Sequence, residues 1–64
     1  HDTDIGDNSH ISTGAVVNGG VSIGQNSFIG SGSVIKQNLK IGSQCFINAK
    51  KFLKKNLKNN SKFL

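Results

Sequence analysis

The first ten residues, HDTDIGDNSH, carry the side chains best suited to chemistry. Both histidines of the chain, His1 and His10, lie here together with all three of its carboxylates, at Asp2, Asp4 and Asp7. Imidazole titrates near neutral pH, so such residues can move a proton to or from a reacting group. The alternative is a solvated turn that carries two unrelated histidines. The elements around this segment decide between the two interpretations.

The chain is short and poor in large apolar side chains. Its 64 residues form one small domain at most. A monomer of this length buries too little surface for a stable core, so association with other subunits is expected. No apolar run approaches the ~20 residues of a membrane span, and no secretory leader is recognisable, so we expect a cytoplasmic protein without a membrane partner. The single cysteine, Cys45, cannot form an internal disulfide and is expected to pack in the core.

Charge is unevenly distributed along the chain. The three acids fall in the first seven residues, whereas all eight lysines lie between Lys36 and Lys62, for a net charge of +5. Arginine, which reads guanine and phosphate through paired hydrogen bonds, is absent, and the four Phe do not have the spacing of a base-stacking platform. We therefore expect no nucleic-acid partner. Lys36 and Lys40 could meet the phosphates of a cofactor, although solvated surface lysines are the simpler interpretation.

Aliphatic residues recur at every sixth position through most of the chain. The series contains nine consecutive members, Ile5, Ile11, Val17, Ile23, Ile29, Ile35, Ile41, Ile47 and Leu53. We expect these side chains to point inward. The residues four positions after each of the first seven members of the series are small or apolar, and we expect them to point inward as well. The repeat position directly after each aliphatic residue is mostly Gly, Ser or Asn. Residues at this position are expected to help turn the corner. A period of six fits a short strand followed by a turn, with three hexads to each coil of a solenoid.

The hexads IGDNSH, ISTGAV, IGQNSF, IGSGSV and IGSQCF resemble the hexapeptide-repeat acyltransferases. This resemblance implies an all-β fold, a left-handed parallel β-helix of about three coils, a hand that is an exception to the usual right-handed crossover. It extends from His1 to about Ala49. The segment HDTDIGDNSHISTGAVVNGGVSIG is similar in particular to the branch of sialic-acid O-acetyltransferases and bacterial diamino-sugar N-acetyltransferases.

The branch resemblance implies an activity and an assembly. The reaction is acetyl transfer from acetyl-CoA to an amine or hydroxyl of a sugar or nucleotide-sugar, without a metal. The active form is a homotrimer with its sites between adjacent subunits. Members of this branch carry upstream coils and an N-terminal α/β domain, so we expect this chain to be a C-terminal fragment that is weakly active or inactive alone.

Residue by residue, the resemblance assigns six candidate site positions. His1 falls on the general base, Asp2 on the acidic neighbour that increases its basicity, and Gly19 on a backbone N–H that stabilises the thioester oxyanion. The acetyl-CoA contacts fall on His10, which lines the site, and on Ser31 and Ala49, which touch the pantetheine arm. Each has a plainer interpretation: the histidines can be solvated, and Gly19 with Gly20 can be a permissive turn.

The C-terminal end departs from the repeat. Lys51 occupies an inward position, and since burying an unpaired ammonium is costly, we expect either a distorted coil or an outward Lys51. Ala49, Phe52, Leu53 and Leu57 also have helical spacing. We therefore expect the β-helix over residues 1–53 and an irregular or short helical tail over 54–64.

Two other classes of protein remain as alternatives. A non-catalytic structural or binding solenoid, such as an ice-binding one, would show a regular row of Thr, but only Thr3 and Thr13 occur. A zinc enzyme of the carbonic-anhydrase type on the same fold would need three histidine ligands, and the chain has two histidines.

Overall fold

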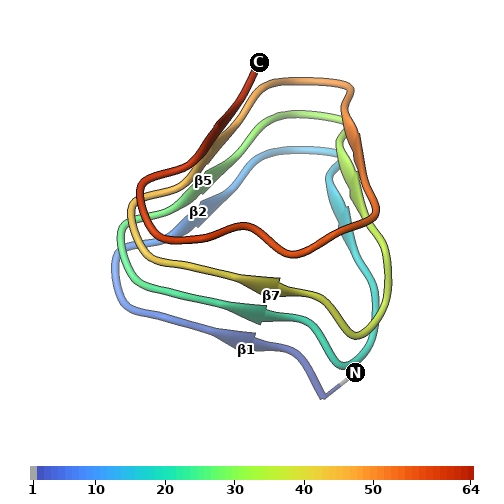
Figure 1. Cartoon of the computed structure of the whole chain (residues 1–64). Coiled ribbons are helices and arrows are strands. Elements are labelled where there is room, and N and C mark those ends of the chain that lie inside the picture. Colours follow the sequence, from blue (N-terminus) through green and yellow to red (C-terminus); the bar gives the residue numbers. More distant parts are fainter. Residues whose placement is uncertain (1) are drawn as a thin grey trace.

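Short strands and tight turns alternate along the whole of residues 2–64, the part of the chain that the computed structural model describes (Figure 1). The strands are β1 (Asp4–Ile5), β2 (His10–Ile11), β3 (Val16–Val17), β4 (Ser22–Ile23), β5 (Phe28–Ile29), β6 (Val34–Ile35), β7 (Lys40–Ile41), β8 (Phe46–Ile47), β9 (Phe52–Leu53) and β10 (Lys62–Phe63). No helix occurs among these residues, and none could therefore cross a membrane.

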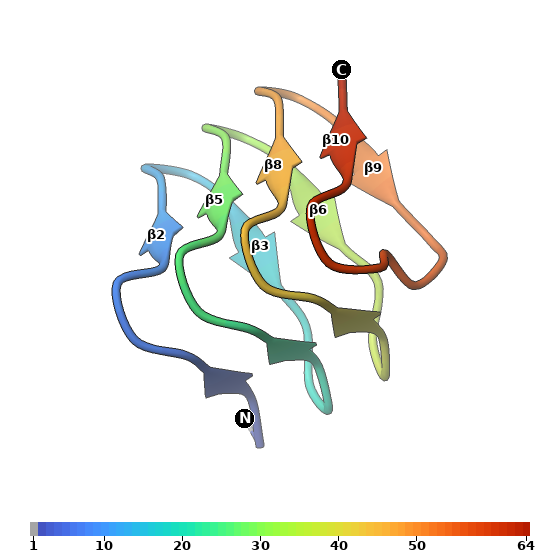
Figure 2. The ribbon, with the colours of Figure 1, turned by 60° about the vertical axis from the view of Figure 1, so that its left-hand side comes forward.

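Successive strands belong to different sheets, so the chain winds around a triangular prism. Sheet A has the order β1-β4-β7, sheet B the order β10-β8-β5-β2 and sheet C the order β3-β6-β9, with every pair parallel. The coil winds left-handed, with the C-terminal coil nearest the viewer in Figure 1, and Figure 2 shows the strands of sheet B side by side. The fold is the left-handed parallel β-helix of about three coils that the repeat and the family resemblance predict.

The core is the stack of aliphatic residues that the period of six placed inside. Ile29, Ile35 and Ile47 are fully buried, and each lies on the equivalent residue of the neighbouring coil, as in the pair Ile29 and Ile47. The residue four positions later also points inward, as predicted, and Cys45 is 2% exposed there. Cys45 therefore packs in the core, with its Sγ 3.1 Å from the carbonyl oxygen of Lys58.

Serine is tolerated inside because the coils themselves supply its hydrogen-bond partners. Ser27 Oγ donates to the carbonyl of Gly42 at 2.8 Å and accepts from the N–H of Cys45 at 3.0 Å. Ser33 Oγ donates to the carbonyl of Asn48 at 2.7 Å in the same way. Since each hydroxyl is paired within the corner, burying it does not carry the cost of an unsatisfied polar group.

The glycines that directly follow four of the inward aliphatic residues, Gly6, Gly24, Gly30 and Gly42, are required for space rather than for a positive φ. A Cβ on Gly24 would lie 2.6 Å from the backbone N of Ser43, and one on Gly30 would lie 2.5 Å from that of Ala49. Positive φ occurs two residues after these positions instead, at Asn26 and Gly32 for example. The turn therefore depends on Asn and Gly at the third residue after the aliphatic, because these residues adopt the left-handed region at least cost.

Gln44 is an exception in this series and supports a stability prediction. Its φ is +57°, and the equivalent residues on the other coils of the same corner are asparagines, Asn8, Asn26 and Asn60. Asparagine adopts this conformation more readily than glutamine, so Gln44→Asn should increase the free energy of unfolding by about 0.5 kcal/mol. Chemical denaturation followed by circular dichroism measures the change. Gln25→Asn, beside it at ordinary φ, is the matched control, and an equal gain in both variants would contradict the explanation.

The C-terminal end continues the solenoid after a register shift. Leu57 forms a bridge with Ile41, 16 residues earlier, whereas Ile41 pairs with Ile23, 18 residues earlier, so the last coil is two residues shorter. β10 then adds to β8 in sheet B, with Phe63 beside Ile47. Of the two expected conformations, the helical one does not form, because these residues complete a coil instead. The division after residue 53 stays a prediction.

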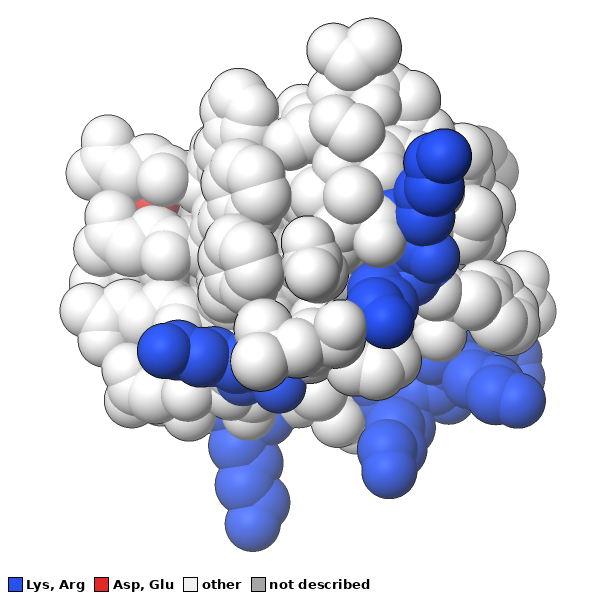
Figure 3. All heavy atoms as spheres, turned by 90° about the horizontal axis from the view of Figure 1, so that it is seen from above, with Lys and Arg blue, Asp and Glu red and all other residues white. Residues whose placement is uncertain are grey.

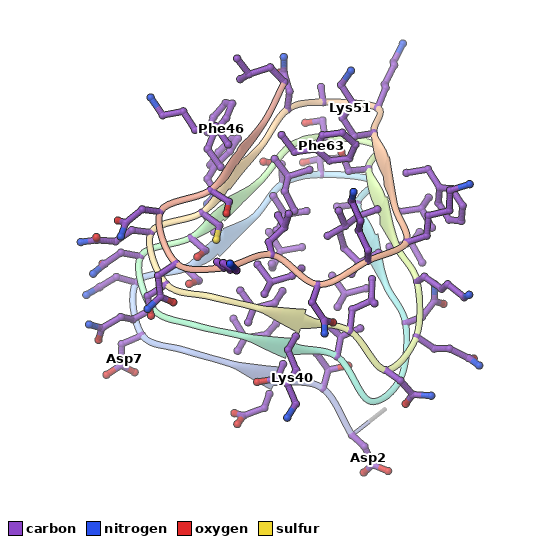
Figure 4. All side chains as sticks on the ribbon, viewed as in Figure 1. Asp2, Asp7, Lys40, Phe46, Lys51 and Phe63 are labelled. Atoms are coloured by element: carbon purple, nitrogen blue, oxygen red, sulfur yellow. The ribbon has the colours of Figure 1, made fainter. Side chains whose placement is uncertain are left out.

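Lys51 avoids burial by turning its ammonium outward. Its backbone keeps the coil, since the N–H of Val34 donates to the Lys51 carbonyl at 2.8 Å. The side chain passes over the last coil, and Nζ lies 5.8 Å from the centroid of the Phe63 ring (Figure 4). A cation over an aromatic face is favourable and leaves the charge hydrated. Of the two expected outcomes, the outward lysine is the one observed.

Candidate functional site

A hollow opens at the corner between sheets C and A, where Figure 4 labels Asp2. This C–A corner comprises residues 2–3, 18–21 and 36–39, which stack because successive coils repeat every 18 residues. The hollow measures about 550 Å³ and is lined by Asp2, Val17, Asn18, Gly19, Gly20, Gln37 and Asn38. Two of the six predicted site residues, Asp2 and Gly19, are therefore brought together here, although 17 positions separate them in the chain.

Hydrogen bonds within the described part of the chain hold the backbone of the C–A corner in place but do not involve the N–H of Gly19. The carbonyl of Gly19 accepts the N–H of Asn38 at 3.0 Å, and the side-chain Nδ2 of Asn18 donates to the carbonyl of Ile35 at 2.9 Å. Among residues 2–64 nothing accepts a hydrogen bond from the N–H of Gly19. A backbone N–H without an acceptor among the described residues, in a residue that lines a hollow, is a candidate donor to an oxyanion.

His1 lies outside the described residues, so its predicted role as the base stays a prediction. Its chain neighbour Asp2 has a φ of +58° at the first turn of the coil and carries its carboxylate on the C–A corner.

His10 lies elsewhere, on the outer face of sheet B. It is exposed, and its ring stacks on that of Phe28, with the centroids 5.4 Å apart and the planes 7° from parallel. Phe28 stacks in turn on Phe46, at 5.2 Å and 9°. We call His10, Phe28 and Phe46 the aromatic ladder; its members are register partners on β2, β5 and β8.

Ser31 and Ala49 lie together at a third place, the corner between sheets B and C (residues 12–15, 30–33 and 48–51). Both residues are exposed, and the two coils join here through the N–H of Lys50, which donates to the carbonyl of Ser31 at 2.8 Å. The N–H of Ala49 donates to Asn48 Oδ1 at 2.8 Å, so Ala49 offers its methyl and carbonyl rather than a free donor. The five predicted site residues that the structure describes thus fall in three separate groups.

The sequence interpretation missed three residues of the C–A hollow. Asn18 precedes the predicted Gly19, whereas Gln37 and Asn38 follow Gly19 and Gly20 by 18 positions. The signal was present in the repeat, because three hexads make one coil and residues 18 apart therefore stack. The same spacing of 18 places Phe28 beside His10 on the neighbouring coil.

Charge separates along the axis of the solenoid. The three acids lie on the first coil, whereas six of the eight lysines fall between Lys50 and Lys62 on the last; Figure 3 shows lysines gathered on one part of the surface and little acidic surface. Lys36 and Lys40 are exposed, as expected of solvated lysines. Within residues 2–64, no group of three His, Cys, Asp or Glu is placed to hold a metal ion.

Coils of six-residue repeats that stack into a triangular prism define a class, the hexapeptide-repeat β-helix proteins. The comparison with protein families agrees: the model of the bacterial transferase hexapeptide family, which spans six repeats, matches residues 2–37 and again 20–55. The chain belongs to this family. The resemblance to hexapeptide-repeat transferases is thereby confirmed, whereas the sialic-acid and diamino-sugar branch stays a prediction.

The fold also matches a solved structure. Serine acetyltransferase isoform 3 from Entamoeba histolytica, crystallised in complex with cysteine, is similar with a TM-score of 0.76 and 20% sequence identity. The match covers 97% of this chain and 32% of that chain, so the present chain spans about a third of the solved protein. At this identity the likeness shows the shared fold alone. No curated protein matches the chain.

Proposed function

We propose that the chain is part of an acetyltransferase that moves the acetyl group of acetyl-CoA to an amine or hydroxyl of a sugar or nucleotide-sugar in the cytoplasm. One observation carries the proposal: in a chain of the bacterial transferase hexapeptide family, Asp2 and Gly19 line the same hollow, and nothing among residues 2–64 accepts a hydrogen bond from the Gly19 N–H. The sugar acceptor and the cytoplasmic setting rest on the resemblance of HDTDIGDNSH and the following hexads to the sugar-modifying branch.

The proposed reaction gives one role each to His1, Asp2 and Gly19. His1 takes the proton from the attacking amine or hydroxyl as the nucleophile forms a bond to the thioester carbonyl carbon, and Asp2 stabilises the imidazolium that results. The carbonyl oxygen becomes an oxyanion that accepts a hydrogen bond from Gly19 N–H. The carbon–sulfur bond then breaks, and His1 returns the proton to the departing thiolate of CoA.

A second subunit is needed to complete this site. Within one chain, Asp2 and Gly19 lie at the C–A corner, whereas Ser31 and Ala49 lie at the corner between sheets B and C. A homotrimer that places the C–A corner of one subunit beside sheet B, with His10, and the B–C corner of the next subunit would unite all three groups. The exposed apolar side chains on the outside of the prism, such as Val16 at 48% and Phe52 at 55% exposed, supply surface that such an assembly would cover.

Native mass spectrometry of the 64-residue chain, with and without acetyl-CoA, tests the proposal directly. We expect a trimer that binds up to three acetyl-CoA molecules, because each site lies between two subunits. The variant Gln25→Asn, remote from the proposed site, is the control for assembly. A trimer or monomer that shows no acetyl-CoA adduct at millimolar concentration would contradict the proposed function of this chain.

A further inference from the structure

We propose that Phe28 is a positioning residue for His10: its ring, and no hydrogen bond, sets the plane of the imidazole. The inference rests on the proposed function, in which His10 lines the acetyl-CoA site, and it deepens that function by naming what orients the histidine. It also assigns a role to an aromatic residue that the sequence interpretation left among the unexplained Phe residues.

Stacking on Phe28 is the one directional contact of the His10 side chain among residues 2–64. Among residues 2–64 no group forms a hydrogen bond with either imidazole nitrogen. The Phe28 ring, in contrast, lies nearly parallel to the imidazole, at 7° and 5.4 Å between centroids. The centroids of the two parallel rings lie farther apart than they would in a direct face-to-face stack, so the rings are offset sideways. Offset stacking is the favoured arrangement of aromatic pairs.

Phe28 is itself held in place by the sheet and by a second ring. Its backbone lies in the middle of sheet B, paired with β2 on one side and β8 on the other. Its side chain is half-buried and is backed by the Phe46 ring at 5.2 Å and 9°. A ring packed from both sides in one sheet has little rotational freedom, so it offers His10 a fixed platform rather than a mobile neighbour.

Orientation by stacking affects how the two imidazole nitrogens of His10 can be used. A histidine at a functional site is usually oriented by a hydrogen bond to one nitrogen, which leaves the other for chemistry. Stacking orients the ring through its face, so both nitrogens remain at the uncovered edge. His10 can then meet a ligand through either nitrogen, as donor or as acceptor, without rearranging a partner in the protein.

The test combines nuclear magnetic resonance with acetyl-CoA titration on the full chain. We expect Phe28→Leu to move the His10 ring-proton resonances downfield, because the ring current of Phe28 is lost, and to weaken acetyl-CoA binding by about 2- to 10-fold. Phe28→Tyr, which keeps the ring, should preserve both. Phe46→Leu is the graded control: it removes the ring behind Phe28 but leaves the ring that stacks on His10, so it should move the His10 resonances and weaken the affinity clearly less than Phe28→Leu does.

A double-mutant cycle separates positioning from a structural role. In a His10→Gln background, Phe28→Leu should produce no further loss of affinity, because the residue it positions is gone. Equal losses in both backgrounds, equal effects of Phe28→Leu and Phe46→Leu, or unmoved His10 resonances would each overturn the inference. If the unchanged chain binds no acetyl-CoA, the proposed function fails and this inference with it; if it binds and only the cycle fails, the proposed function stands.

Discussion

In a protein that also contains the upstream coils implied by the family resemblance, His1→Gln is expected to reduce the rate of acetyl transfer by about 100-fold or more, with no loss of trimer and little change in acetyl-CoA affinity. A general base contributes roughly 10²- to 10⁴-fold to the rate of such a reaction, because the attacking amine or hydroxyl must lose its proton as the bond to carbon forms. Release of free CoA thiol, measured with a panel of amino sugars and nucleotide-sugars as acceptors, gives the rate. Glutamine keeps the approximate size and polarity of histidine but cannot accept the proton.

His10→Gln is the matched control for this variant, since His10 is the only other histidine. It should weaken acetyl-CoA binding while retaining most of the rate at saturating acetyl-CoA, because its role is to line the site rather than to move the proton. Retained turnover in His1→Gln would rule out His1 as the base. A loss of the trimer in His1→Gln would mean that the residue has a structural role.

Ile29→Ala is expected to destabilise the solenoid by about 2 to 5 kcal/mol, the range for truncating a large aliphatic side chain in a packed core. Ile29 is fully buried at the centre of the stack, between the aliphatic residues of the coils on either side. Domains of this size have total stabilities of about 3 to 10 kcal/mol, so the variant should be largely unfolded or should melt far below the unchanged chain. Thermal and chemical unfolding followed by circular dichroism measure the effect.

Ile5→Ala provides the comparison at the same position of the repeat. Ile5 is 43% exposed on the first coil, so its truncation removes fewer contacts and leaves no enclosed cavity. We expect a loss of less than about 1 kcal/mol for this surface-type change. Similar losses in the two variants would contradict the idea that the buried stack of aliphatic residues, rather than the turns, provides most of the stability.

The period of six predicted the fold because it follows from the geometry of the coil. Every inward side chain must meet the equivalent side chain of the next coil, and this requirement leaves an aliphatic residue at every sixth position. The corner chemistry was predicted less well. Gly24 and Gly30 were expected to help turn the corner, but they are needed because a Cβ at either position would clash with the backbone of the next coil. A sequence shows that glycine is present at a position without showing which of its two properties the position uses.

The C-terminal end was harder to predict for a related reason. The pattern of Ala49, Phe52, Leu53 and Leu57 satisfies both a helix and a shortened coil. The structure forms the coil, with Leu57 beside Ile41 and Phe63 beside Ile47, because the apolar end of the preceding coil is there to be covered. A short isolated helix has no comparable surface to bury, and its own propensity is too weak to compete.

By itself the sequence determined the solenoid, its inward residues and the types of chemistry open to HDTDIGDNSH, because all three depend on local spacing and residue type. Only the tertiary structure decided which residues meet. It brought Gly19 to Asp2 and placed His10 on Phe28, while it kept Ser31 and Ala49 at another corner. The physical reason is that proximity across coils depends on the number of residues per turn of the solenoid and on which sheet each strand joins, and these follow from the packing of the whole core.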